Sequence, residues 1–253
     1  MPDPAPFFPL GDAVPVGGAE YPAEAVLRTL DPYLSDARRS RIAAVAAARA
    51  FGVVPVLEGL VDSGNVNAVL RSAEGLGYGA AHLVGLGGEA AALAEAVEGE
   101  GLAAPDRRAA RRASQGAHKW VEVGAWVTAE AYVAYVRARG GRVAVTALRD
   151  DALPVEAWDF SRPTALVVGN EHAGASAAML DAADAALALP LDGFVQSYNV
   201  SVAAALALYH ARRQRGSTHA DLDAERQRVL RAHYTARAVP HAAALLAYAH
   251  RAG

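Results

Sequence analysis

The stretch LPLDGFVQSYNVSVAAALAL, residues 189–208, contains a turn, a dense group of polar side chains and the start of a helix. Pro190 and Gly193 interrupt regular structure and predict a loop, and small and apolar residues predict a helix from about Ser197. Five of six successive side chains at this junction carry an amide or a hydroxyl: Gln196, Ser197, Tyr198, Asn199 and Ser201. Burying so many polar groups is costly unless each finds a partner, and capping would use only one or two. Helix capping and a polar pocket both stay open as interpretations.

A second stretch, ALVVGNEHAGAS at residues 165–176, predicts a buried strand that runs into a tight turn. Gly169 and Gly174 allow such a turn and let the backbone approach a ligand closely. The spacing is not GxGxxG, so the dinucleotide fingerprint does not apply. Taken alone, this pattern is explained better by a tight strand–helix turn without a ligand than by a binding site.

A third stretch, SGNVNAVLRSAEGLG at residues 63–77, predicts an amphipathic helix. Its apolar positions fall on one arc that should pack on a sheet: Val66, Val69, Leu70, Ala73 and Leu76. Asn67, Arg71 and Glu74 share a separate arc, and Asn65 lies where a short polar side chain commonly caps the helix. A capped helix with a solvated arginine accounts for the stretch by itself.

Between residues 51 and 215, short β-branched runs alternate with helical patterns, which is typical of an α/β domain with a mostly parallel sheet. The expected strands are VVPVLEGL, AAHLVGL, KWVEVGAWV, RVAVTAL, TALVVGN and AALALPL, with helices from about Asn65, at Glu89–Val97, through Tyr132–Ala138 and from about Ser197. Ligands of such sheets bind at the carboxyl ends of the strands. The rest is expected to be a flexible arm (1–22), a helical extension broken near Asp31-Pro32 (23–50) and a helical tail (216–253).

Composition limits the classes of protein. The 253 residues include no cysteine, which excludes a disulfide framework and thiolate metal sites. The first twenty residues lack a basic leader and no apolar run reaches the length of a membrane span, so we expect a cytoplasmic protein. A net charge of −3 argues against nucleic-acid binding. Arginines nevertheless cluster at Arg38, Arg39 and Arg41; at Arg107, Arg108, Arg111 and Arg112; and at Arg212, Arg213 and Arg215. Each run can also be a solvated helix face.

Taken together, the three stretches resemble the signature motifs of the SpoU (TrmH-like) branch of the SPOUT methyltransferases. The family's Asn-x5-Arg helix start stands here as Asn65 to Arg71, its Gly-x-Glu-x-x-Gly turn as residues 169–174, and its Ser-Leu-Asn-Val-Ser run as residues 197–201. The resemblance covers residues 35–215 in the family's order. Within this branch, the chain looks most similar to the tRNA (guanosine-2′-O)-methyltransferases. Three stretches carry this similarity: GAHKWV (116–121), VTALRDDA (145–152) and the arginine-rich segment 36–49.

The resemblance implies a trefoil knot at about residues 164–210, although connection rules treat knots as nearly absent. It implies a homodimer and S-adenosylmethionine bound in the knot. The expected cofactor contacts are Thr146, Gly169, Leu189, Leu191 and Tyr198. Tyr198 departs from the family, which usually has leucine there.

The implied reaction moves a methyl group from the sulfonium to a ribose 2′-hydroxyl of RNA, without a metal. The expected catalytic residues are Arg71, Asn65, Glu171, Ser197 and Asn199. A guanidinium, with a pKa above about 12, is a poor base, so we favour Arg71 as an electrostatic stabiliser of the alkoxide, with the general-base role left open. The expected RNA-binding residues are Arg38, Arg39 and Arg41.

Three other functions compete with methylation of tRNA. A ribosomal-RNA 2′-O-methyltransferase of the same branch often carries a larger N-terminal RNA-binding domain than the fifty or so residues available here. A non-catalytic RNA-binding protein on the knotted fold has no need for the full polar set. A generic α/β enzyme for small molecules would require all three motif matches to be accidental.

Overall fold

The computed structural model describes residues 3–88, 90–92 and 119–252, and the chain divides into two compact units. One unit comprises Met1–Phe8 with Ala50–His219, and the other Pro9–Arg49 with Ala220–Gly253. The sequence predicts two separate appendages, one at each end of the chain. That prediction differs from the structure, because the helices at the two ends pack on each other.

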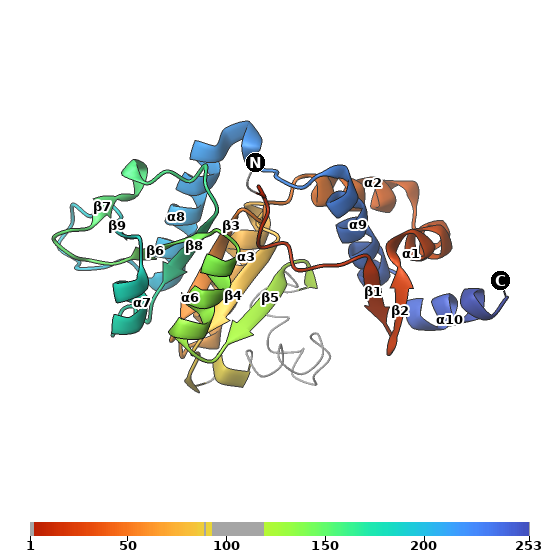
Figure 1. Ribbon diagram of the computed structural model, residues 1–253, viewed down its shortest axis with the longest axis horizontal. Coiled ribbons are helices and arrows are strands. Elements are labelled where there is room, and N and C mark those ends of the chain that lie inside the picture. The colour runs from red at the N-terminus through yellow and green to blue at the C-terminus, as the bar shows by residue number, and fades with distance from the viewer. Residues whose placement is uncertain (1–2, 89, 93–118, 253) are drawn as a thin grey trace. The chain divides into compact units, whose positions relative to one another are not determined.

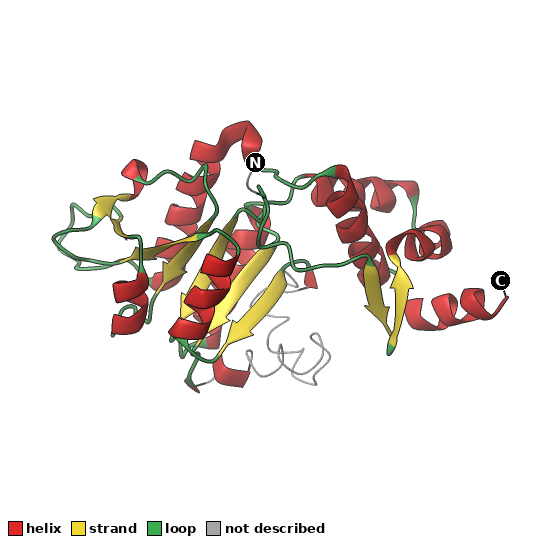
Figure 2. Ribbon diagram, in the orientation of Figure 1, coloured by secondary structure: helices red, strands yellow, loops and turns green. Residues whose placement is uncertain are grey.

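The larger unit is built on a parallel sheet of seven strands in the order β5-β4-β3-β8-β6-β9-β7. The strands are β3 Val53–Glu58, β4 Ala80–Val84, β5 Glu122–Trp126, β6 Arg142–Thr146, β7 Leu153–Pro154, β8 Thr164–Val168 and β9 Ala185–Ala188. The predicted strands and the parallel sheet are confirmed, and the two-residue strand β7 was not predicted. Figure 2 shows the strands as the centre of this unit, with helices around them.

Helices cover both faces of the sheet. Helices α3 (Ser63–Gly75) and α8 (Val200–Arg215) pack together against one face, and α6 (Ala129–Ala138) and α7 (Ala177–Ala182) pack together against the other (Figure 1). Every residue of β3 and β8 is buried, as expected for central parallel strands covered on both sides. The predicted helix at Glu89–Val97 lies mostly outside the described residues.

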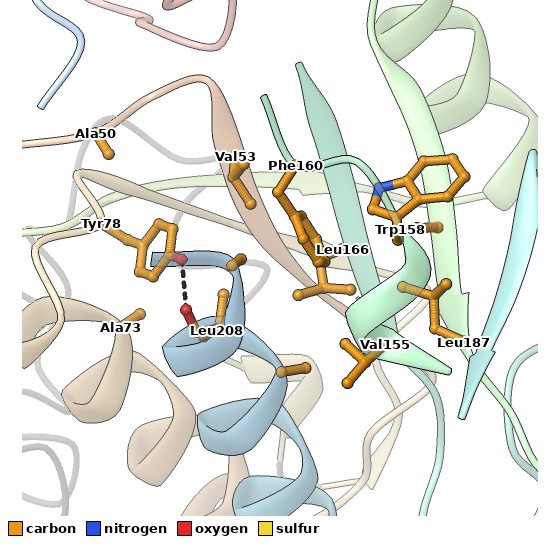
Figure 3. Packing of buried hydrophobic residues seen from close by; sticks show 13 residues of the cluster. Ala50, Val53, Ala73, Tyr78, Val155, Trp158, Phe160, Leu166, Leu187 and Leu208 are labelled. Carbon is orange, nitrogen blue, oxygen red and sulfur yellow. Dashed lines mark hydrogen bonds between the residues drawn. The ribbon is translucent and has the colours of Figure 1, made fainter. Parts of the chain in front are cut away.

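A hydrophobic cluster joins α3 and α8 to the sheet (Figure 3). Leu166 of β8 and Leu187 of β9 pack there with Phe160 and Trp158. The hydroxyl of Tyr78 is fully buried, and it donates a 2.7 Å hydrogen bond to the carbonyl of Leu208 in α8. Because a buried hydroxyl without a partner is costly, this bond helps to hold the position of α8 on the sheet.

The smaller unit contains a β-hairpin and four helices among its described residues. The elements are β1 Ala13–Val16, β2 Ala19–Pro22, α1 Ala23–Leu30, α2 Asp36–Ala47, α9 Ala224–Ala238 and α10 Ala242–Ala252. Helix α9 packs against α1 and α2, and buried Arg49 donates to the hydroxyl of Tyr234 at 3.1 Å. The predicted helical break at Asp31-Pro32 is confirmed, as a short 3₁₀ turn separates α1 from α2.

The prediction of a flexible arm over residues 1–22 is wrong for residues 13–22, which form the β1–β2 hairpin. Gly17 and Gly18 link the strands with φ angles of 63° and 82°. Two successive positive φ angles suit a tight hairpin turn whose twist matches its strands. The Gly-Gly pair was therefore a turn signal, although the five prolines nearby had suggested irregular structure.

No helix among the described residues is both long enough and apolar enough to span a membrane. The same described residues contain no group of three or more histidine or carboxylate side chains that could hold a metal ion.

Candidate functional site

The site begins at the N-terminus of α3, which follows β3 directly. Asp62 caps this helix by accepting a 2.6 Å hydrogen bond from the backbone N–H of Gly64. The prediction that Asn65 is the cap is therefore wrong, because the helix starts two residues earlier than expected. Asn65 instead donates through Nδ2 to Glu171 Oε1 at 2.8 Å, across 106 positions of the chain.

The third motif joins the same network. Asn199 caps α8 by accepting hydrogen bonds through Oδ1 from the N–H of Ser201 at 2.9 Å and from its hydroxyl at 2.6 Å. Its Nδ2 donates to Asn65 Oδ1 at 3.3 Å. Glu171, Asn65 and Asn199, one residue from each motif, thus form a continuous hydrogen-bonded chain.

Sheet topology explains this meeting. Strands β3 and β8 are parallel neighbours, paired from Val53↔Thr164 to Leu57↔Val168, so their carboxyl ends lie at one edge. Helix α3 leaves from the end of β3 and Glu171 lies just beyond the end of β8. Helix α8 packs against α3 along the same face. Open α/β sheets usually bind their ligands at such a place, in the crevice beyond the carboxyl ends of adjacent strands.

The turn that carries Glu171 is tightly closed. Asn170 and Gly174 exchange backbone hydrogen bonds of 2.9 and 3.0 Å, and Gly174 has a φ of 71°. A Cβ on Gly169 would lie only 2.2 Å from the backbone nitrogen of Ala175. Glycine is therefore required at both ends of this turn, as the motif predicted.

Glu171 has one satisfied and one unsatisfied oxygen. Oε1 accepts from Asn65, whereas the buried Oε2 has no hydrogen-bond partner among the described residues. A buried carboxylate oxygen in this condition can accept from a donor or attract a cation.

Arg71 lies six residues beyond Asn65, on an exposed part of α3. It makes no hydrogen bond or ion pair with the described residues of this chain. The structure therefore brings Asn65, Glu171 and Asn199 together but does not bond Arg71 to them. Ser197 is also exposed and outside this network.

The predicted cofactor contacts follow adjacent strands. Thr146 ends β6, Gly169 follows β8, and Leu189 follows β9, and these three strands are neighbours in the sheet. The hydroxyl of Thr146 donates to the carbonyl of Val167 at 3.2 Å. Leu189 and Leu191 are half-buried.

Tyr198 closes the loop between β9 and α8. Its hydroxyl donates a 2.8 Å hydrogen bond to the carbonyl of Pro190. The two ends of the loop are thereby tied together by a side chain that replaces the leucine of the resembled motif.

The model of the SpoU rRNA Methylase family matches residues 52–209, which is more than half of the chain. The chain belongs to this family.

Similar proteins agree with this membership. A tRNA (guanosine(18)-2′-O)-methyltransferase of Thermus thermophilus is 35% identical over 181 residues, covering 72% of this chain and 84% of the relative. The crystal structure of the A. aeolicus TrmH/SpoU tRNA-modifying enzyme superposes with a TM-score of 0.67 at 25% identity, covering 81% of this chain and 98% of that one. The AdoMet-bound SpoU methyltransferase AviRb of Streptomyces viridochromogenes has a TM-score of 0.52 at 26% identity, over 64% of this chain and 60% of that one.

The predicted fold, the α/β knot of the SPOUT methyltransferases, is confirmed by the sheet and these likenesses. The predicted limits of the knot, residues 164–210, stay a prediction.

The predicted RNA-binding arginines of this SpoU methylase lie on α2, in the smaller unit. Arg38 and Arg41 are exposed. Arg39 pairs with Asp36 and donates to the carbonyl of Asp31 at 3.1 Å, so part of its charge is already compensated. The arginines at 107–112 lie outside the described residues.

Two residues that support the site, Glu58 and Asn170, are not predicted from the sequence motifs. Glu58 is buried at the end of β3, and Asn170 Nδ2 donates to the carbonyl of Gly59 at 2.9 Å. A signal was present, since Glu58 is the one charged residue in the strand VVPVLE. A carboxylate at the carboxyl end of a buried strand needs a partner or a function.

Proposed function

We propose that this chain transfers a methyl group from S-adenosylmethionine to the ribose 2′-hydroxyl of a guanosine in tRNA. The observation that carries the proposal is the hydrogen-bonded chain Glu171–Asn65–Asn199, because it unites all three motifs at one sheet edge. The T. thermophilus relative, a tRNA (guanosine(18)-2′-O)-methyltransferase, supports the choice of substrate. A tRNA substrate would place the reaction in the cytoplasm.

S-adenosylmethionine supplies a methyl group on a positively charged sulfur when it is bound. The residues at the strand ends fit such a donor, because Glu171 Oε2 is buried without a partner among the described residues and Leu189 and Leu191 offer half-buried apolar contacts. Backbone groups at Gly169, Leu189, Leu191 and Tyr198 would hold the adenosine, with Thr146 nearby. The reaction we propose needs no metal.

The ribose hydroxyl is a poor nucleophile, so the site must stabilise the oxyanion that develops as its proton leaves. We assign this role to Arg71, whose guanidinium stays charged at neutral pH. Asn65 and Glu171 would orient the reacting groups, while Asn199 and Ser197 shape the pocket. Holding the reactants in line can by itself supply several kcal/mol, on the order of 7–11 in favourable cases.

A second copy of the chain would bring Arg71 into the site. Helix α8 exposes Val202, Leu206 and Tyr209 at 45%, 42% and 53%, and their spacing of four and three residues puts them on one face. An exposed apolar stripe of this kind is typical of an interface. We therefore propose a homodimer that uses α8 and completes two sites.

On the smaller unit, Arg38, Arg39 and Arg41 would contact the phosphates of the same tRNA. Arg38 and Arg41 are exposed, and Arg39 is half-buried and pairs with Asp36. Phosphate contacts position an RNA without reading its sequence.

The test is transfer of radiolabelled methyl to unmodified tRNA and ribosomal RNA in parallel, with mapping of the labelled nucleotide. We expect label on a tRNA ribose, and a loss of about 100-fold or more in Arg71→Ala with cofactor binding retained. Arg162→Ala, at an exposed arginine just before the start of β8, is the matched control. Equal loss of cofactor binding in Arg71→Ala would make this arginine structural.

Ribosomal RNA is the second candidate substrate, because the chain belongs to the SpoU rRNA Methylase family. Label on ribosomal RNA alone would establish it. Label on a base would overturn the reaction type, and no label on either RNA, in a chain that binds them, would indicate a non-catalytic binder.

A further inference from the structure

Glu58 is a buried charge that none of the three motifs includes. It ends β3, is only 6% exposed and has apolar neighbours along its strand. Both carboxylate oxygens accept from Ser176: Oε1 from the hydroxyl at 2.6 Å and Oε2 from the backbone N–H at 3.1 Å. Since a buried carboxylate is costly unless it is hydrogen-bonded, the pair is a well-defined structural link.

Ser176 lies two residues beyond Gly174, which closes the turn that carries Glu171. Its hydroxyl also caps α7 by accepting from the N–H of Met179 at 3.1 Å. At the other end of the turn, Asn170 Nδ2 donates to the carbonyl of Gly59 at 2.9 Å. Glu58 and Gly59 thus hold the chain on both sides of Glu171, at Ser176 and at Asn170.

Glu171 lies between these two anchors, and its Oε1 accepts from Asn65. The position of the turn relative to the start of α3 therefore depends on the anchors at Glu58 and Gly59. Displacements of about 1 Å in a positioned group can lower a rate by as much as 100-fold.

We propose that Glu58 and Ser176 are positioning residues for methyl transfer, which set the place of Glu171 at the site without touching the substrate. This inference rests on the proposed function, because it assigns the link to the same site. It predicts that losing the link slows the methyl-transfer step, while tRNA binding stays nearly unchanged.

The test compares Ser176→Ala, which removes one bond to Glu58, with Ser176→Thr, which keeps a hydroxyl. In single-turnover assays with excess enzyme, we expect Ser176→Ala to lower the rate about tenfold, as for loss of one charge-assisted hydrogen bond, and Ser176→Thr to restore most of it. Glu58→Leu should also slow transfer, because it removes both oxygens that accept from Ser176. Thr128→Ala, which removes the comparable cap of α6, controls for loss of a helix cap.

A double-variant cycle separates positioning from general destabilisation. In a Glu171→Gln background, Ser176→Ala should have little further effect on the rate, because it acts through Glu171. A full additional tenfold loss in that background, or a rate in Ser176→Ala equal to the wild-type rate, would overturn the proposal.

A measurement that does not depend on methyl transfer tests the link even if the proposed function is wrong. Amide hydrogen exchange in residues 170–176 should rise about tenfold in Ser176→Ala but not in Thr128→Ala. If the wild-type chain methylates no RNA, the proposed function fails and this exchange still tests the link. Unchanged exchange in Ser176→Ala would refute the link itself.

Discussion

Replacing Tyr198 with phenylalanine removes one oxygen atom from the loop proposed to hold the cofactor. That oxygen donates the 2.8 Å hydrogen bond to the carbonyl of Pro190. Phe194 is fully exposed and Val195 is 63% exposed, so these side chains do not anchor the middle of the loop. The Tyr198 bond is the one hydrogen bond within residues 190–198 in the part of the chain that the structure describes.

The magnitude follows from the exposure of the bond. A neutral hydrogen bond contributes about 0.5–1.5 kcal/mol net, and the 38% exposure of Tyr198 favours the lower half of that range. A loop released by Tyr198→Phe must be ordered again when the cofactor binds, so this free energy is subtracted from binding. At about 1.4 kcal/mol per factor of ten, we expect affinity to fall about two- to fivefold.

Isothermal titration with S-adenosylhomocysteine measures this change. Tyr198→Leu, which installs the residue usual in the family, should weaken binding at least as much as Tyr198→Phe. Tyr248→Phe, at a 71% exposed tyrosine of the smaller unit, is the matched control. Affinity in Tyr198→Phe equal to that of wild type would refute the idea that this bond preorganises the loop.

Three further predictions concern stability, RNA binding and assembly. Burial lowers the pKa of His82 to about 3, so its neutral form stabilises the fold above about pH 6.5, and this contribution is lost as the pH falls toward 3. At roughly 1.4 kcal/mol per pH unit, lowering the pH from 6.5 to 5 should reduce the free energy of unfolding of the wild type by about 2 kcal/mol more than that of His82→Phe. Urea unfolding at the two pH values measures this, and equal reductions in both proteins would contradict it. The double variant Arg38→Ala with Arg41→Ala should weaken tRNA binding. In filter-binding assays, the slope of log affinity against log salt concentration should become shallower by up to about two, and an unchanged slope would place the phosphate contacts elsewhere. Leu206→Glu should yield monomers in light scattering and abolish methyl transfer, unlike Val127→Glu at another exposed apolar position, and an active monomer would contradict the shared site.

Local patterns were sufficient for most secondary structure of the larger unit. The alternation of β-branched runs and helical periods predicted the parallel sheet, because strand and helix periods are properties of short segments. Local patterns gave a wrong prediction at residues 13–22, where the prolines indicated a flexible arm but the Gly-Gly pair forms the turn of a hairpin. They also placed the cap of α3 at Asn65 instead of Asp62, since both are good capping residues and the first helical turn depends on where β3 ends.

The sequence by itself determined the family and the candidate residues, because Asn65, Glu171 and Asn199 stand in recognisable motifs. Only the tertiary structure decided that these three bond to one another, that Glu58 holds the turn of Glu171, and that the two ends of the chain build one unit. The physical reason is the range of the interactions. Periodicity reports on neighbours within a few residues, whereas these hydrogen bonds join positions more than 100 residues apart and exist only after the parallel strands have aligned their carboxyl ends.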